Sequence, residues 1–219
     1  MTAAAIGAPC ARDAPRDCPV CPRLVAYRAA NAERRPDWFN GAVPSFGDPD
    51  GRLLVIGLAP GVSGANRTGR PFTGDFAGGL LYQTLGEFGF AAGAFDARPD
   101  DGLTLVDAMI TNAVRCVPPE NKPTGAEINA CRPFLSATIA AMPRLKAALC
   151  LGKIAHDSAV RALATPLKAA KFGHGARHEI GGLTVFDSYH CSRYNTQTRR
   201  LTPEMFRDVF AAVRALLDG

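Results

Sequence analysis

Residues 53–75 read LLVIGLAPGVSGANRTGRPFTGD, and this stretch predicts the fold class. Its first four residues, Leu53–Ile56, form an apolar run that is typical of a buried strand. From Phe76 to Phe90, apolar residues recur at helical spacing. The local order is therefore strand, glycine-rich loop and helix. In an open α/β sheet, loops that leave the carboxyl ends of the strands form the ligand crevice.

The loop over residues 57–75 combines several kinds of ligand-binding group. Arg67 and Arg70 supply cations, Phe72 an aromatic face and Asp75 a carboxylate. Its glycines let the backbone approach a ligand closely. The GxxxxGK[ST] pattern of a phosphate loop and the GxGxxG pattern of a dinucleotide site are both absent from it. This mixture suits a nucleotide better than an apolar small molecule.

Three further strands are predicted, at residues 108–115, 145–151 and 183–186. A helix follows each strand: one over residues 124–142, whose start has a capping-box pattern, one over 152–163, and an amphipathic one after Thr202-Pro203. Residues 22–35 predict a basic helix, whereas 38–50, 93–101, 117–123 and 191–200 predict loops. Strands that alternate with helices predict a parallel sheet covered on both faces.

Length and composition limit the class of protein. The 219 residues are 47% hydrophobic, so we expect one domain over residues 16–219 after a disordered tail over residues 1–15. The net charge of +5 permits nucleic-acid binding without proving it. No apolar run approaches the roughly 18 residues of a membrane helix, and the N-terminus lacks the features of a secretory signal. We therefore expect a cytoplasmic protein with no membrane partner.

Four of the seven cysteines form a candidate ligand set. Cys18 and Cys21 make a CxxC pair, Cys116 follows a predicted strand, and Cys131 lies on the next predicted helix. Four thiolates hold either a tetrahedral zinc ion or a [4Fe-4S] cluster, and the spacing does not choose between them. Buried free thiols, which behave as small apolar groups, are the structural alternative.

Polar residues also follow the later strands. Asn112 ends the second predicted strand, Asn121 lies in the proline-rich loop, and His190 follows the fourth strand. Because the carboxyl ends of parallel strands share one edge, these side chains can converge on the crevice of the glycine-rich loop. Taken singly, each has a structural alternative, since buried polar groups usually just find hydrogen-bond partners.

Long motifs in this chain resemble the family-5, or type B, uracil-DNA glycosylases. They are GLAPGxxGxNRTGRPFTGD at residues 57–75, VRCxPPxNKPT at 114–124, SYHxSRxNTQTxRLTxEMF at 188–206 and CPxCPRLVAY at 18–27. More distantly, the chain resembles the family-4 iron–sulfur enzymes. The resemblance implies a three-layer α/β/α sandwich on a four-stranded parallel sheet, which agrees with the order of elements above.

The resemblance also implies roles for individual residues. By position, Cys18, Cys21, Cys116 and Cys131 match the ligands of a [4Fe-4S] cluster with a mainly structural role. Phe72 matches the aromatic residue that stacks on an extruded base, His190 the histidine at the pyrimidine carbonyl, and Asp75 the proposed catalytic carboxylate. Asn121 matches a family-5 asparagine and is a candidate catalytic residue. Asn112 matches the base-reading asparagine of family 4. Which asparagine contacts the base is left open.

The expected activity is a monofunctional glycosylase that flips uracil out of DNA and hydrolyses its N-glycosidic bond. The expected base-binding residues are Gly57, Leu58, Ala59, Pro60, Gly61, Phe72, Asn112, Asn121 and His190. The expected DNA-binding residues are Arg67, Arg70, Ser192, Arg193, Asn195, Gln197, Arg199 and Arg200. We expect a monomer that associates with the nucleoid when it is bound to DNA.

Leu58 marks a departure from family 4, which has a glutamate at this position. No acid is therefore available there to activate water, and the resemblance implies a pocket that also admits deaminated purines such as hypoxanthine. The alternative from another class is a non-catalytic iron–sulfur or zinc protein that binds nucleic acid or senses redox state.

Overall fold

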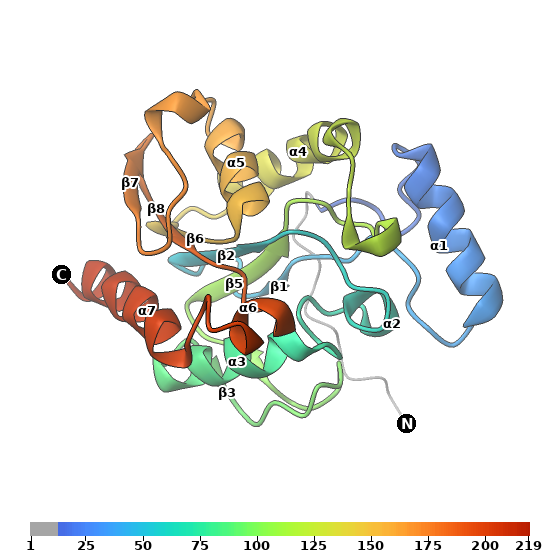
Figure 1. Cartoon of the computed structure of the whole chain (residues 1–219), viewed down its shortest axis with the longest axis horizontal. Coiled ribbons are helices and arrows are strands. Elements are labelled where there is room, and N and C mark those ends of the chain that lie inside the picture. Colours follow the sequence, from blue (N-terminus) through green and yellow to red (C-terminus); the bar gives the residue numbers. More distant parts are fainter. Residues whose placement is uncertain (1–12) are drawn as a thin grey trace.

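A mixed six-stranded sheet forms the centre of the computed structural model, which describes residues 13–219 (Figure 1). The strands lie in the order β1 (Phe46–Gly47), β5 (Ala108–Asn112), β2 (Leu53–Gly57), β6 (Ala147–Leu151), β8 (Leu183–Ser188) and β7 (Arg177–Ile180). The four inner strands are parallel to one another, and β1 and β7 pair antiparallel at the two edges.

The inner strands are buried on both faces because helices cover each face. Along β2, Leu53 and Val55 belong to one apolar core, and Leu54 and Ile56 belong to the other. The first core packs against α3 (Phe76–Glu87) and α7 (Pro203–Asp218), and the second against α4 (Gly125–Ala140) and α5 (Lys153–Ala162). These helix pairs lie on opposite sides of the sheet (Figure 1). The predicted three-layer α/β/α sandwich is confirmed.

The helices that flank the sheet begin where the sequence patterns place them. Thr124 Oγ1 accepts from the Glu127 N–H at 3.3 Å, and the Glu127 carboxylate accepts from the Thr124 N–H at 2.7 Å. This reciprocal capping box satisfies two of the orphan N–H groups at the start of α4. At the start of α7, Thr202 Oγ1 accepts from the Met205 N–H at 3.2 Å, and proline occupies the first turn.

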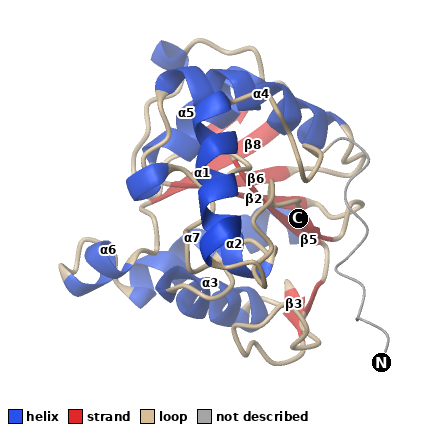
Figure 2. Cartoon of the chain, turned by 90° about the vertical axis from the view of Figure 1, so that its right-hand side faces the viewer, coloured by secondary structure: helices blue, strands red, loops and turns tan. Residues whose placement is uncertain are grey.

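The remaining elements are short, apart from α1 (Pro22–Arg34). They are α2 (Ala65–Thr68), the ribbon of β3 (Ala91–Ala92) and β4 (Thr104–Leu105), 3₁₀ turns at Pro119–Asn121 and Leu167–Ala169, and α6 (Arg193–Gln197). In Figure 2, α1 and α2 lie in front of the sheet.

Several boundaries correct the predictions. The second predicted strand ends at Asn112 rather than at residue 115. The edge strands β1 and β7 were not predicted, because β1 has two residues and β7 is mostly polar, with only Ile180 buried. The segment at 117–123 contains a 3₁₀ turn and the one at 191–200 contains α6, although loops were predicted at both.

The predicted tail over residues 1–15 is too long at its C-terminal end, and its first twelve residues lie outside the described part of the chain. Asp13 is buried and pairs with the buried Arg115 at 3.1 Å. Its carboxylate also accepts from the N–H of Ser45 at 2.8 Å. The start of the described chain is therefore held by a buried ion pair. No helix within residues 13–219 is both long enough and apolar enough to cross a membrane.

Candidate active site

A pocket of about 570 Å³ opens at the carboxyl ends of β2, β5 and β8. It is lined by Leu58, Ala59, Pro60, Gly61, Val62, Ser63, Gly64, Ala65, Phe72, Asp75, Phe76, Ala77, Asn112, Asn121, His190, Ser192 and Arg193. The loop after β2, the start of α3 and the turn after β8 supply most of this lining. The ends of these strands therefore converge on one crevice, as the sequence predicts.

The floor of the pocket depends on Gly57, the last residue of β2. A Cβ at Gly57 would collide with Asn112 Oδ1 and would lie 2.6 Å from Phe72 Cζ. The Phe72 ring is stacked on the His190 imidazole, with ring centroids 5.8 Å apart and planes 27° apart. Phe72 also has a φ of 53°, a left-handed conformation that costs energy in a residue other than glycine. Glycine at position 57 thus lets an aromatic ring and an amide approach the same point.

His190 lies in the turn after β8, and this turn is braced from two sides. Its carbonyl oxygen accepts from Asn195 Nδ2 at 2.8 Å. The preceding Tyr189 donates its N–H to His174 Nδ1 at 3.2 Å and stacks on that ring at 5.0 Å. Burial lowers the pKa of His190 to about 4. The imidazole is therefore neutral at neutral pH and can donate one N–H into the pocket.

Asp75 caps α3 and presents its carboxylate to the pocket. Oδ1 accepts from the Gly78 N–H at 3.3 Å. Oδ2 lies so close to the backbone of Gly64 that a Cβ there would collide with it. Asp75 is exposed to solvent and lines the hollow of the pocket. Burial raises the pKa of Asp75 above its usual 3.8, and the N–H groups of Gly78 and Ala77 oppose this shift.

Both candidate asparagines line the pocket. Asn112 is buried at the end of β5, beside its register partner Gly57. Asn121 lies on the 3₁₀ turn with a φ of 56°, and its Oδ1 points toward Gly61. Each amide can pair with the edge of a base, so the choice between them stays open.

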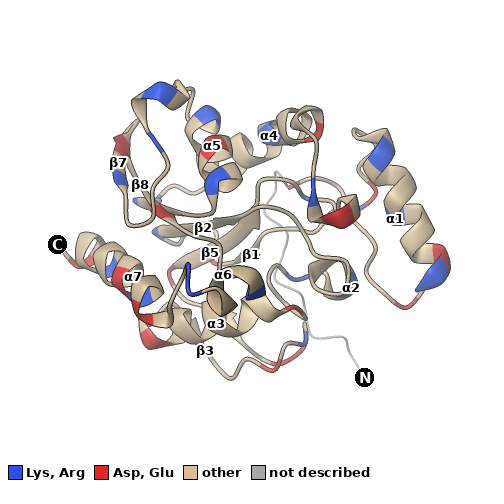
Figure 3. Ribbon diagram, viewed as in Figure 1, with Lys and Arg blue, Asp and Glu red and all other residues tan. Residues whose placement is uncertain are grey.

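The residues predicted to bind the DNA backbone cluster on α6. Ser192 caps this helix through the Asn195 N–H at 3.4 Å. Arg193 lies over the Phe76 ring at 5.2 Å, at the rim of the pocket. Gln197 and Arg199 are exposed, and α6 with the loop after it carries basic residues and no acidic ones (Figure 3).

Two residues on this surface are already engaged. Arg200 lies over the Tyr189 ring at 4.6 Å. Asn195 uses its amide for the His190 carbonyl. Arg67 is exposed on α2 but lines a separate hollow with Arg16 and Arg98, outside the pocket that contains His190. Its contact with DNA stays a prediction.

The prediction that Arg70 binds DNA is wrong. Its guanidinium is 1% exposed and forms a bidentate pair with Asp101, at 2.7 and 2.6 Å. Nε donates to Thr73 Oγ1 at 2.7 Å, and the rings of Phe46 and Tyr82 lie within 5.4 Å of the guanidinium carbon. A guanidinium that is buried and paired with a buried carboxylate is not accessible to a phosphate.

The four predicted metal ligands lie in one apolar cluster between α1, the segment after β5 and α4. Cys131 Sγ accepts from the Arg115 N–H at 3.3 Å. Burial raises the pKa of the Cys116 thiol to about 12, and the nearby guanidinium of Arg28 opposes this shift. Arg28 is itself buried, and its Nε has no hydrogen-bond partner among the described residues. A buried cation beside four thiols fits an anionic group held between them.

The spacing of these sulfurs distinguishes between the two candidate groups. In a tetrahedral zinc site with Zn–S bonds of about 2.3 Å, the sulfurs are about 3.8 Å apart. Within residues 13–219, no three of the four Sγ atoms lie within 4.8 Å of one another. The four sulfurs are therefore not gathered as a single zinc ion requires.

Sequence reasoning missed part of the pocket lining. Phe76 follows Asp75 directly, and Gly64 lies within the quoted glycine-rich loop, so both had a local signal. Val62, Ser63 and Ala65 lie in the same stretch, whereas Ala77, on α3, had no such signal, because a small apolar helical residue is compatible with any neighbour.

Comparison with known proteins agrees with this geometry. Residues 44–214 match the Uracil DNA glycosylase superfamily. The type-5 uracil-DNA glycosylase of Thermus thermophilus is 43% identical over 206 residues, which cover 91% of this chain and 93% of the relative. The chain belongs to the type-5 uracil-DNA glycosylases. The type-5 enzyme of Mycobacterium tuberculosis is 41% identical over 209 residues, covering 91% of this chain and 78% of that protein.

A type-4 uracil-DNA glycosylase, from Saccharolobus solfataricus, is 31% identical over 199 residues and matches 87% of this chain and 85% of its own length. The type-5 enzymes are more similar to this chain than the type-4 enzyme, which is the order that the motifs predict. The expected membership of the type-5 uracil-DNA glycosylases, with type 4 as the more distant relative, is confirmed.

Proposed function

We propose that this chain removes uracil from DNA by hydrolysing the N-glycosidic bond, as an early step of base excision repair. The observation that carries the proposal is the convergence of Phe72, Asp75 and His190 with two asparagines on one pocket. The type-5 relatives are named for this activity, which supports the same conclusion. We further propose that the protein acts as a monomer in the cytoplasm, on the nucleoid.

The pocket suits a base that has left the duplex. An N-glycosidic bond is inaccessible inside stacked DNA, so the nucleotide must be extruded, at a cost of a few kcal/mol. The Phe72 ring offers a stacking face, and Asn112 and Asn121 offer amides for the edge of the base. The volume of about 570 Å³ is sufficient for a nucleotide.

His190 is suited to stabilising the leaving group. As the bond breaks, the base gains negative charge, which a nearby N–H can stabilise by hydrogen bonding. A neutral imidazole provides this donor without being an acid, and burial keeps His190 neutral. The bracing of its carbonyl by Asn195 limits the motion of the turn, so the donor is positioned before the reaction begins.

Asp75 is suited to the sugar side of the reaction. An ionised carboxylate near an oxocarbenium-like sugar stabilises its positive charge or orients the attacking water. Asp75 lies at the start of α3. Its carboxylate and the side-chain amide of Asn121 both approach Gly61 in the pocket loop. Leu58 supplies no second acid, so the proposed mechanism rests on Asp75 and on stabilisation of the leaving group.

We propose that Ser192, Arg193, Gln197, Arg199 and Arg200 contact the DNA backbone beside the pocket. Exposed cations that neutralise phosphates release counterions, so their contribution falls as salt concentration rises. Asn195 contributes to the same contact indirectly, because it stabilises α6.

We also propose that Cys18, Cys21, Cys116 and Cys131 hold a [4Fe-4S] cluster. When bound, this group would join three separate parts of the chain, which is a structural role. The side chain of Arg28 donates to the carbonyls of Arg16 and Cys18 and thereby holds the CxxC segment in place. Anaerobically purified protein should be brown and should contain about four irons per chain. Colourless protein that contains zinc instead of iron would contradict the proposed cluster.

The test of the proposed function is direct detection of the released base. A duplex with one uracil is incubated with the protein, and free uracil is measured by mass spectrometry, together with strand cleavage at that site after alkali. Release of uracil with no strand cleavage before the alkali treatment indicates a monofunctional enzyme. Absence of both products with folded, iron-loaded protein would overturn the proposal and favour a non-catalytic nucleic-acid-binding protein.

The same assay with hypoxanthine tests the broader substrate range. We propose that deaminated purines are also excised, because the pocket is roomy and recognition rests on stacking and amide contacts. No detectable release of hypoxanthine from a matched duplex would restrict the enzyme to uracil.

A further inference from the structure

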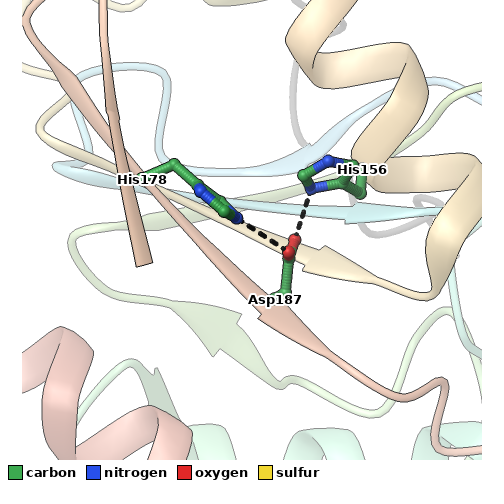
Figure 4. A group of neighbouring side chains, drawn as sticks. All are labelled: His156, His178 and Asp187. Carbon is green, nitrogen blue, oxygen red and sulfur yellow. Dashed lines mark hydrogen bonds and ion pairs between the residues drawn. The ribbon is translucent and has the colours of Figure 1, made fainter. Parts of the chain in front are cut away.

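A buried carboxylate lies between two imidazoles on the side of the sheet that α5 covers (Figure 4). Asp187 Oδ1 is 2.7 Å from His156 Nδ1, and Asp187 Oδ2 is 3.3 Å from His178 Nε2. Asp187 and His156 are 0% exposed, and His178 is 17% exposed. The three residues come from β8, α5 and β7, and none of them lines the pocket that contains His190.

The carboxylate of Asp187 needs a compensating positive charge, because an isolated charge is very costly in a dry interior. Within residues 13–219, its ion-pair partners are the two imidazoles, and its remaining hydrogen bond is the Gly173 N–H at 3.4 Å. The charge must therefore come from a proton on an imidazole or from a bound metal ion.

The orientation of His156 suits a metal ligand. Its Nε2 is 3.0 Å from the carbonyl oxygen of Ala170, which accepts only if Nε2 carries a proton. With Nε2 protonated, Nδ1 faces Asp187 either as an N–H donor of an imidazolium or as the ligand of a metal ion. Metal-binding histidines commonly donate their other N–H to a carbonyl or carboxylate in this way.

We infer that His156 Nδ1, His178 Nε2 and the Asp187 carboxylate bind a zinc ion. The three ligand atoms all lie within 4.8 Å of one another. Around a tetrahedral zinc ion with bonds of about 2.0–2.1 Å, such atoms are about 3.3 Å apart. The His178 contact already has this separation, and the His156 contact requires a small outward shift of the Asp187 carboxylate. Two imidazole nitrogens select zinc over magnesium or calcium, which prefer oxygen ligands.

Cys150 lies near this site but is not counted as a ligand, because its Sγ atom is not among the ligand atoms that lie within 4.8 Å of one another. It is the register partner of Asp187 on the neighbouring parallel strand, so the two side chains leave the sheet on the same face. Cys150 is fully buried and belongs to the same core. A zinc ion held by one carboxylate and two neutral imidazoles keeps one positive charge and an open fourth position, which a water molecule or hydroxide would fill. The ion would join α5, β7 and β8 at this edge of the sheet.

Zinc-edge X-ray absorption tests the proposal without any variant. Protein with its iron site filled receives one equivalent of Zn²⁺ and is passed through a desalting column. We expect about one zinc per chain, bound to nitrogen and oxygen at about 2.0–2.1 Å. Failure to retain zinc would overturn the proposal and assign the charge to an imidazolium. A zinc shell of four sulfurs would also overturn it, because the metal would then occupy the cysteine site.

Variants locate the site. His178→Gln is chosen because His178 is the most exposed of the three ligands, so its loss disturbs the core least. We expect zinc affinity to fall by at least about tenfold, with the iron content unchanged. His174→Gln is the matched control, since this residue lies in the same part of the chain and is outside the cluster. Equal zinc affinity in His178→Gln and the wild type would contradict the assignment.

Discussion

Replacement of Gly57 by alanine should damage the floor of the pocket while leaving the rest of the fold intact. The added methyl would collide with Asn112 Oδ1 and would lie 2.6 Å from Phe72 Cζ. The Phe72 ring must then move by roughly 0.8 Å to reach an ordinary carbon–carbon contact. Both groups that must move line the pocket and are the ones proposed to hold the base.

The expected effect is a loss of about 10- to 100-fold in the rate of uracil excision, because displacing a positioning group by about 1 Å can cost this much. The cost to stability should be about 1–3 kcal/mol, the usual range for overpacking a core. The rate is measured in single-turnover reactions on an end-labelled duplex that is treated with alkali and separated on a gel.

Gly79→Ala is the matched control for this substitution. A Cβ at Gly79 meets no atom within 4 Å, and the residue lies on the exposed part of α3. We expect the wild-type excision rate together with a stability gain of about 1 kcal/mol, because alanine favours a helix. A folded Gly57→Ala protein that excises uracil at the wild-type rate would refute the role given to this floor.

Three further predictions concern other residues. Arg70→Met should lower the free energy of unfolding in urea by about 3–5 kcal/mol, because it leaves Asp101 buried without its partner. Burial raises the pKa of Asp101, but the hydrogen bonds from Arg70 and from the Asp96 and Leu103 N–H groups outweigh it and lower this pKa to about 2. The contribution of the ion pair is therefore present above the usual pKa of 3.8 and is lost as pH falls toward 2; an equal stability difference at pH 7 and pH 2 would contradict it. Wild-type excision should decline in acid as Asp75, whose pKa burial raises above 3.8, takes up a proton. Asp75→Asn should be slower and should lack this decline, and an unchanged acid limb in the variant would remove Asp75 from the reaction. Arg199→Ala should weaken duplex binding and reduce the slope of log affinity against log salt by about one, with the rate at saturating protein retained. Loss of that rate with unchanged affinity would show that Arg199 acts in the chemical step.

Much of the fold could be predicted from the sequence because the inner strands β2 and β6 contain almost continuous apolar runs. Residues 53–56 and 147–151 face two cores, so they form continuous apolar runs that a partly exposed strand would not. The edge strands lack this signal. In β7 three of the four residues are not buried, and the pairing is decided by the neighbouring β8 rather than by local preference.

The candidate site could be predicted where the order of the strands along the chain determines which residues lie close together. The ends of parallel strands share an edge, so the meeting of Asn112, His190 and the loop after β2 follows from topology. The environment of a single arginine does not follow in this way. Arg70 and Arg67 lie three residues apart in the same loop, and one is buried because its partner Asp101 lies 31 residues further along the chain. The cluster of His156, His178 and Asp187 was missed for the same reason, since its spacing resembles no known ligand pattern.

The most direct test of the account compares wild-type protein with His190→Ala on one uracil-containing duplex under single-turnover conditions. We predict cleavable sites at uracil with the wild type, none in a matched thymine duplex, and a rate about 10²- to 10³-fold lower in His190→Ala with binding largely retained. No strand break at uracil with folded wild-type protein, or an unchanged rate in His190→Ala, would contradict the claim that this pocket breaks the glycosidic bond.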